Sequence, residues 1–149
     1  MIGLIQRARR GAVRVDDKVV GEIGVGLVCL VGVEQGDGPA QAERLAERVL
    51  NYRVFPDEAG RMNLSLLQTE GGVLAVPQFT LAADTRSGNR PSFTPAADPG
   101  VAQELFDVFV DTLSRRHAGT VATGRFGADM QVELINDGPV TFWLEAPPG

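Results

Sequence analysis

The first segment whose residue types suggest chemistry is Val76-Pro77-Gln78-Phe79-Thr80-Leu81. Because Pro77 lacks a backbone N–H, a strand that contains it must end there or lie at a sheet edge. Gln78 and Thr80 would then share one face by the two-residue period of a strand, while Phe79 points the other way. An amide, a hydroxyl and free backbone N–H groups at a strand end can hold a developing oxyanion without any titratable side chain. An ordinary strand terminus would have the same spacing.

A second segment, Asn136-Asp137-Gly138-Pro139-Val140-Thr141, consists largely of residues that favour turns. On composition alone it is interpreted as a simple turn, because only about 5–6% of the bonds before proline are cis.

A third feature is the loop predicted over residues 82–98, which carries Arg86, Arg90 and Phe93. Loops of this length are often functional. Further arginines cluster near the N-terminus, namely Arg7, Arg9, Arg10 and Arg14. The planar arginine fork suits phosphates, so a local basic patch is one interpretation of these residues. A bias in genome composition is the other.

Other catalytic groups are scarce in this sequence. A serine or cysteine nucleophile activated by imidazole needs a histidine beside it, and His117 is the single histidine. His117 follows Arg115-Arg116 at the predicted end of a helix, where a cation suits the helix dipole. The one cysteine, Cys29, lies in an apolar stretch, as a buried structural thiol would. We therefore expect no metal site, no cofactor and no histidine-activated nucleophile.

The composition is typical of one globular domain. The chain has 149 residues, of which 44% are apolar and 22% charged, so a single domain spanning residues 1–149 is expected. The net charge of −5 argues against nucleic-acid binding through broad electrostatics. No apolar run approaches the roughly 20 residues of a membrane helix, and the N-terminus lacks the pattern of a signal peptide. A cytoplasmic protein without a membrane partner is the expectation.

The order of the predicted elements favours an α/β fold. Helical spacing predicts one helix that Asp37 caps and that has Pro39 in its first turn, and a second helix from Asp98 to Arg116. Four residues of the second helix are expected to face inward: Val101, Leu105, Val108 and Phe109. A loop or hairpin is predicted over residues 56–72, and strands at residues 2–9, 12–15, 18–23, 27–33, 73–81, 132–135 and 140–144. We predict a single α/β domain with layered, mixed sheets and two main helices.

Four stretches, PQFTLAADT, RPSF, TGRFGADMQV and NDGPVTFWL, occur in this order along the chain. Together they resemble the D-aminoacyl-tRNA deacylase family, also called D-tyrosyl-tRNA deacylases, and the likeness runs from MIGLIQR to FWL. The resemblance implies a homodimer that hydrolyses the ester joining a D-amino acid to the 3′ end of tRNA. It also implies removal of glycine mischarged onto tRNA for alanine, and an α/β fold with layered sheets.

The resemblance also implies the site residues. In this family the Gly-Pro pair found here in the NDGPVTFWL stretch is cis and reaches across the dimer into the partner's pocket. Here that pair is Gly138-Pro139, held in place with help from Arg7. Rigid backbone carbonyls near the α-carbon of the substrate would exclude an L side chain by a clash, while leaving room for hydrogen or a D side chain.

The remaining implied residues are Gln78, Phe79 and Thr80, which match the catalytic motif of the family. Nothing nearby in the sequence could act as a base for Thr80, so we favour a mechanism in which backbone N–H groups of Phe79 and Thr80 bind the carbonyl oxygen. The 2′-hydroxyl of the terminal adenosine would help to activate water, and Thr80 would orient the substrate. This mechanism is a hypothesis.

Position 77 departs from the family, which usually has serine where this chain has Pro77. A sister branch that removes L-alanine from tRNA for threonine also opens this motif with Pro-Gln, but Phe79, Arg7 and the GPVT stretch match the D-specific branch. Three alternatives stay open: a relaxed hydrolase that also accepts L-aminoacyl-tRNA, a non-catalytic module that binds the tRNA acceptor end, and a structural dimer without a ligand.

Overall fold

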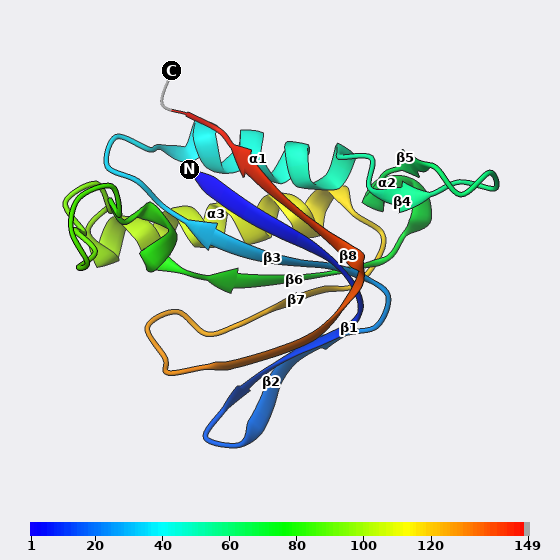
Figure 1. Ribbon diagram of the computed structural model, residues 1–149, viewed down its shortest axis with the longest axis horizontal. Coiled ribbons are helices and arrows are strands. Elements are labelled where there is room, and N and C mark those ends of the chain that lie inside the picture. Colours follow the sequence, from blue (N-terminus) through cyan, green and yellow to red (C-terminus); the bar gives the residue numbers. More distant parts are fainter. Residues whose placement is uncertain (148–149) are drawn as a thin grey trace.

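One long, bent strand organises the fold. The computed structural model describes residues 1–147, in which β1 (Ile2–Val15) pairs with three other strands. The other strands of this six-stranded sheet are β2 (Lys18–Ile23), β3 (Gly26–Gly32), β6 (Gly72–Pro77), β7 (Val121–Thr123) and β8 (Gln131–Glu145). The order is β2-β1-β3-β6-β7, with β8 on the other edge of β1 (Figure 1). The β3–β6 and β6–β7 pairs are parallel and the rest antiparallel, so the sheet is mixed, as predicted.

Two predictions about strand ends were wrong. Residues 2–9 and 12–15 form the single strand β1, and residues 132–135 and 140–144 belong to the single strand β8. The two strands pair along their whole length, from Ile2 opposite Glu145 to Arg14 opposite Gln131, and this pairing carries each strand through the segment interpreted as a break. The expected turn at residues 136–139 is a bulge inside β8, where the register shifts on both sides of Ala8.

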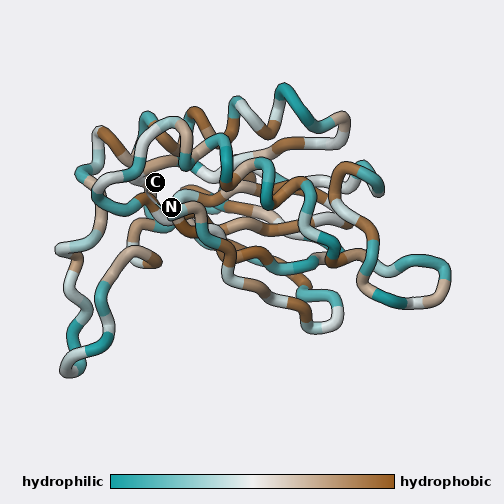
Figure 2. Tube along the Cα trace, turned by 90° about the horizontal axis from the view of Figure 1, so that it is seen from above, coloured by the Kyte–Doolittle hydropathy of each residue, from teal (hydrophilic) through white to brown (hydrophobic). Residues whose placement is uncertain are grey.

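The helices cover one face of the sheet. Helices α1 (Pro39–Asn51) and α3 (Pro99–Arg116) lie beside each other above the strands in Figure 1, and both were predicted. Leu45 and Val49 of α1 and Phe109 and Leu113 of α3 belong to one buried core, which also contains the strand residue Leu27. Figure 2 shows hydrophobic residues along the strands and hydrophilic ones at the loop tips, as expected of a buried sheet.

A smaller core fills the opposite face of the sheet. Here the far halves of β1 and β8, together with β2, fold under β3 and β6, and Val13, Ile23, Val28, Leu74 and Val76 are buried between them. The molecule therefore has a helical layer, a central sheet and a second β layer, which agrees with the layered α/β fold that was predicted.

The helix starts differ in detail from the prediction. The N-cap of α1 is Gly38, whose N–H donates to the Gln41 side chain, while the Asp37 carboxylate accepts from the Glu34 N–H. Asp98 precedes α3 without a side-chain cap, and Val101 is exposed on that helix, so its predicted inward position was wrong. Within residues 1–147, none of the helices has the length and hydropathy needed to cross a membrane.

Short elements complete the chain. The stretch predicted as a loop or hairpin holds the strands β4 (Phe55–Pro56) and β5 (Met62–Leu64) and the helical turn α2 (Leu66–Thr69). A 3-10 turn, η1 (Phe79–Ala82), follows β6. The three-residue strand β7 was not predicted.

Candidate active site

The first motif lies where β6 ends. The predicted strand over residues 73–81 was wrong beyond Pro77, because the Gln78 N–H makes the last bond to β3, to the Val31 carbonyl at 2.8 Å, and the chain then turns into η1. The two-residue period therefore does not place Gln78 and Thr80 on one face. The turn brings them together instead, and Gln78 Nε2 donates to Thr80 Oγ1 at 2.5 Å.

The turn also determines how the backbone donors are presented. The first N–H groups of a helix have no carbonyl partner within it, and Phe79 and Thr80 occupy that position in η1. Phe79 and Thr80 are both exposed, with 58% of the Phe79 surface accessible. Donors on a rigid turn directly after a buried strand could bind a carbonyl oxygen without moving.

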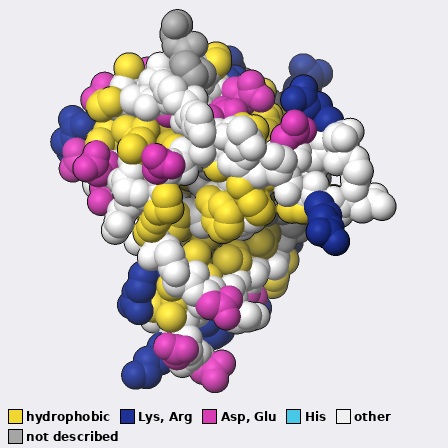
Figure 3. Space-filling view, turned by 90° about the vertical axis from the view of Figure 1, so that its left-hand side faces the viewer, with side chains coloured by type: hydrophobic (Ala, Val, Ile, Leu, Met, Phe, Trp, Pro, Cys, Tyr) yellow, Lys and Arg dark blue, Asp and Glu magenta, His cyan; other side chains and the backbone are white. Residues whose placement is uncertain are grey.

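A hollow of about 440 Å³ lies beside this turn. It is lined mainly by apolar side chains from three separate parts of the chain: Val76, Pro77, Gln78, Phe79, Ala97, Pro99, Ala102, Phe126, Gly127, Ala128, Met130 and Val132. Figure 3 looks onto this side of the molecule, where hydrophobic side chains gather at the middle of the face. Mostly apolar hollows with a few polar groups at the edge are typical ligand sites.

Phe126 and Met130 were not predicted as site residues. They belong to the TGRFGADMQV stretch, which was quoted for the resemblance without a role. The Arg125 N–H approaches Met130 Sδ at 3.4 Å, and a Cβ at Gly124 would come within 2.8 Å of the same sulfur. Glycine at position 124 therefore lets the loop before β8 fold closely against Met130. Only the motif itself could have indicated these residues.

The second motif forms the bulge of β8. The Gly138–Pro139 bond is cis, as the resemblance implied. Gly138 has a φ of +144°, and a Cβ there would come within 2.7 Å of Val140 Cγ2, so glycine is required. Asn136 Oδ1 accepts from the Val140 N–H at 2.7 Å, which closes the bulge.

Arg7 braces this bulge from the neighbouring strand. Its Nε donates to the Asp137 carbonyl at 2.9 Å, and its Nη1 donates to the Val54 carbonyl at 2.6 Å. A partly buried guanidinium with two carbonyl acceptors is held in one orientation. Arg7 therefore lies against the Gly138-Pro139 segment.

The structure does not bring the two motifs together in one chain. Gln78 and Phe79 line the hollow, whereas Arg7, Gly138 and Pro139 are absent from its lining within residues 1–147. Within one chain, Gly138 and Pro139 therefore lie outside the hollow that they are expected to complete.

Three of the arginines singled out in the sequence contact acidic side chains. Arg10 and Arg14 both contact Glu133 of β8, at 2.7 and 3.3 Å, so these two hold β8 on β1. In the loop after η1, Arg86 makes two contacts with the Asp84 carboxylate, and these hydrogen bonds lower the pKa of Asp84 to about 2.

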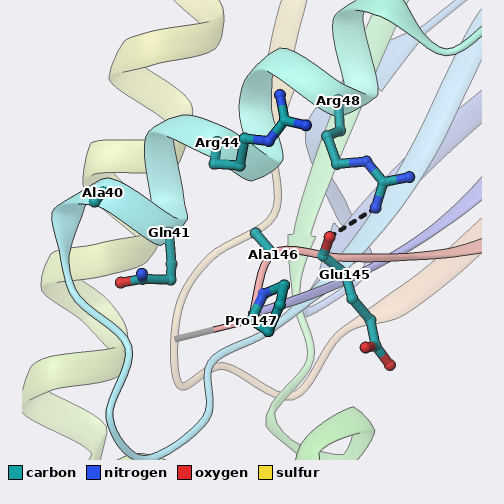
Figure 4. Close-up of a pocket in the computed structure, with 7 residues that line it drawn as sticks. All are labelled: Ala40, Gln41, Arg44, Arg48, Glu145, Ala146 and Pro147. Atoms are coloured by element: carbon teal, nitrogen blue, oxygen red, sulfur yellow. Dashed lines mark hydrogen bonds between the residues drawn. The ribbon is translucent and has the colours of Figure 1, made fainter. Parts of the chain in front are cut away.

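A larger hollow, of about 540 Å³, lies elsewhere. It is bounded by one side of α1 and the end of the described chain, with Arg44 and Arg48 on the helix (Figure 4). Arg48 Nη1 donates to the Glu145 carbonyl at 2.7 Å across it. It holds no residue of either motif, so its greater volume does not make it the candidate site.

Neither His117 nor Cys29 belongs to the site. His117 is the C-cap of α3, and its Nε2 lies 2.6 Å from the carbonyl of Gly71, the residue before β6. Burial raises the pKa of the Cys29 thiol to about 12, which keeps it protonated and unreactive. Across residues 1–147, the structure groups no three histidine, cysteine, aspartate or glutamate side chains as metal ligands.

Comparison with known proteins agrees with the geometry. Residues 4–145 match the model of the D-Tyr-tRNA(Tyr) deacylase family. A D-aminoacyl-tRNA deacylase of Halorhodospira halophila is 68% identical over 148 residues, covering 99% of this chain and 96% of that protein. One from Methylococcus capsulatus is 63% identical, again over 99% of this chain and 96% of the relative.

Two solved structures share the fold. That of a c-Myc DNA Unwinding Element Binding Protein has a TM-score of 0.94 and 35% identity, with 99% of each chain covered. That of a probable eukaryotic D-amino acid tRNA deacylase has a TM-score of 0.83 over 97% of this chain, at 17% identity. Because the family model matches nearly the whole length of this chain, the chain belongs to the D-Tyr-tRNA(Tyr) deacylase family.

Proposed function

We propose that this chain hydrolyses the ester bond between a D-amino acid and the 3′ end of tRNA, and that it also removes glycine mischarged onto tRNA for alanine. Membership of a deacylase family makes it a hydrolase of aminoacyl-tRNA esters. The observation that carries the assignment to this site is the apolar hollow with the Gln78–Thr80 turn at its edge.

The hollow suits the terminal adenosine of tRNA. Its volume of about 440 Å³ falls in the range of small-molecule sites, and Phe126 offers an aromatic ring for a base. An adenosine seated there would present its ester near the N–H groups of Phe79, which lines the hollow, and of Thr80, which follows it in the turn.

The chemistry that follows needs few side chains. The two N–H groups would bind the developing oxyanion, and the 2′-hydroxyl of the substrate would help to activate the attacking water. The Gln78–Thr80 hydrogen bond fixes the hydroxyl that orients the substrate. Water adds to the carbonyl carbon, and the ester oxygen leaves with a proton as the 3′-hydroxyl of tRNA.

A homodimer would complete the site. Within residues 1–147, strand β8 pairs with β1 alone, and it presents Val132, Ile135 and Trp143 as exposed apolar residues. Covering such an edge with a second copy would bury these side chains. The braced Gly138-Pro139 bulge of one copy would then meet the hollow of the other, where its rigid carbonyls exclude an L side chain. Glycine has no side chain to exclude. Because charged tRNA is a cytoplasmic substrate, the protein would act in the cytoplasm.

The first experiment compares hydrolysis of D-tyrosyl-tRNA, L-tyrosyl-tRNA and glycyl-tRNA for alanine by the purified protein. Release of D-tyrosine and glycine alone is the expected result and means that Pro77 is tolerated. Release of L-tyrosine as well would identify the relaxed hydrolase. Binding without release of any amino acid would identify an acceptor-end binding module.

A further inference from the structure

Two exposed aromatic rings stand at the edge of the hollow. The rings of Phe79 and Phe93 lie 5.2 Å apart, centroid to centroid, at an angle of 49°. They remain 58% and 44% exposed respectively, so neither ring is placed there to fill the core. Phe79 also lines the hollow, whereas Phe93 does not, and the pair therefore extends the apolar wall outward from the hollow.

The segment that carries Phe93 is firmly held. Gln35, in the loop between β3 and α1, donates from its backbone N–H to the Pro95 carbonyl at 2.9 Å and from its side chain to the Thr94 carbonyl at 2.8 Å. Ser92 and Asp84 exchange both backbone hydrogen bonds, at 2.7 and 2.9 Å. The ring of Phe93 is thus anchored on both sides in the chain, and its exposure is a property of the fold.

Positive charge lies on the same loop. Residues 83–98 extend from the body of the molecule at the left of Figure 1, with Arg86 and Arg90 exposed. Arg86 is held by Asp84, whereas Arg90 lies three residues before Phe93 in the chain. Exposed aromatic rings beside a cation are how proteins hold single-stranded nucleic acid, because bases stack on the rings and the cation meets the phosphate.

We infer that the Phe79–Phe93 pair is a stacking surface for the nucleotide that precedes the terminal adenosine of tRNA, with Arg90 meeting the phosphate between the two. The inference rests on the proposed function, since it requires the adenosine in the hollow. Phe79 belongs to both surfaces, so a strand that leaves the hollow passes over Phe93 next.

The test compares three substrates of increasing length: 3′-D-tyrosyl-adenosine, the D-tyrosyl trinucleotide CCA, and D-tyrosyl-tRNA. Phe93→Ala should raise KM about tenfold for the trinucleotide and the tRNA, with kcat unchanged, because base–aromatic stacking contributes on that order. The adenosine substrate should be hydrolysed at the native rate. Phe93→Trp should restore the native KM, whereas Phe93→Leu, which keeps apolar bulk without a ring, should not.

Two controls separate this inference from other roles of the ring. Met62→Ala removes a similarly exposed apolar side chain from β5 and should leave KM and kcat unchanged for all three substrates. Sedimentation of Phe93→Ala reports its oligomeric state, which should match that of the native protein.

Specific outcomes would overturn the inference. An equal loss on all three substrates would mean that Phe93 supports the Phe79 turn instead. Native KM values throughout, full rescue by leucine, or dissociation of the oligomer would each exclude a stacking role. If the native protein hydrolyses none of the substrates, the proposed function fails. The inference then still predicts that the uncharged CCA trinucleotide binds about tenfold more weakly to Phe93→Ala.

Discussion

At the scale of single residues, the chain carries a turn with two backbone donors and, outside the hollow beside that turn, a braced bulge. The Gln78–Thr80 contact fixes the turn, and the bonds of Arg7 and Asn136 fix the bulge. The residue types could be selected from the sequence, and the resemblance supplied their roles. The way in which these residues contact one another could not be predicted from the sequence, because a 3-10 turn and a bulge leave no periodic pattern in it.

Replacing Thr80 by valine distinguishes orientation from nucleophilic attack. If the backbone N–H groups do the chemistry, Thr80→Val should lower kcat by about tenfold through the lost contact with Gln78. Thr80→Ser should recover most of that loss. Single-turnover hydrolysis of D-tyrosyl-tRNA measures both variants. A fall of several thousandfold would instead indicate a hydroxyl nucleophile.

Arg7 and Arg9 provide a matched pair for chiral selection. Arg7→Met removes the bonds to the Asp137 and Val54 carbonyls, so the bulge loses its brace and the preference for D over L substrate should fall about tenfold or more. Arg9, also in β1, is exposed, and its Nε lies 3.9 Å from Asp137 Oδ1. Such a long, exposed ion pair contributes little energy. Arg9→Met should keep the native preference. The measurement is the ratio of kcat/KM for D- and L-tyrosyl-tRNA, and equal effects of both variants would contradict the brace.

At the scale of elements, the helices and the buried strands could be predicted from local patterns. Leu45, Val49, Leu105 and Phe109 follow the helical period and are buried as that period requires. The breaks predicted within β1 and β8 were wrong because pairing between the two strands outweighs the local preference for a turn. Strand β7 was missed since three residues are too few to show a period.

Gly26 tests the close approach of β3 and β6. A Cβ at Gly26 would lie 1.8 Å from the Gly72 carbonyl oxygen, so Gly26→Ala must push two paired strands apart. We expect a loss of about 3 kcal/mol or more in the free energy of unfolding.

Gly100, near the start of α3, is the control. Nothing lies within 4 Å of the position of its Cβ, so Gly100→Ala should stabilise the protein by about 0.5–1 kcal/mol. Denaturant unfolding measures both variants. A Gly26→Ala protein as stable as the native one would mean that the strands can separate without cost.

At the scale of the whole molecule, the candidate hollow unites segments far apart in the chain. The lining comes from three segments, residues 76–79, 97–102 and 126–132. They meet because β6, α3 and the loop before β8 converge at the end of the sheet where β6 finishes. No local pattern contains that information. For this reason the sequence indicated Gln78, Phe79 and Thr80 as site residues but not Phe126 and Met130, which line the same hollow.

The acidic character of the molecule predicts a weak dependence on salt. With a net charge of −5, contact is expected to be confined to the 3′ end of the tRNA and to one or two phosphates. The slope of log affinity against log salt should then be about −1 to −2, and Arg90→Gln should reduce its size by about 1. Fluorescence titration with uncharged tRNA between low and moderate salt measures both slopes. A slope that corresponds to six or more phosphates would contradict such limited contact.

The position of Gly138-Pro139 inside a continuous strand limits how this motif can change during evolution. A surface loop such as residues 83–98 tolerates insertions, since lengthening a loop costs little. One residue added to β8 would instead turn every following side chain to the opposite face of the sheet, Leu144 from core to solvent among them. Lineages of this fold can therefore vary this motif by exchanging residues, but not by changing the length of the segment.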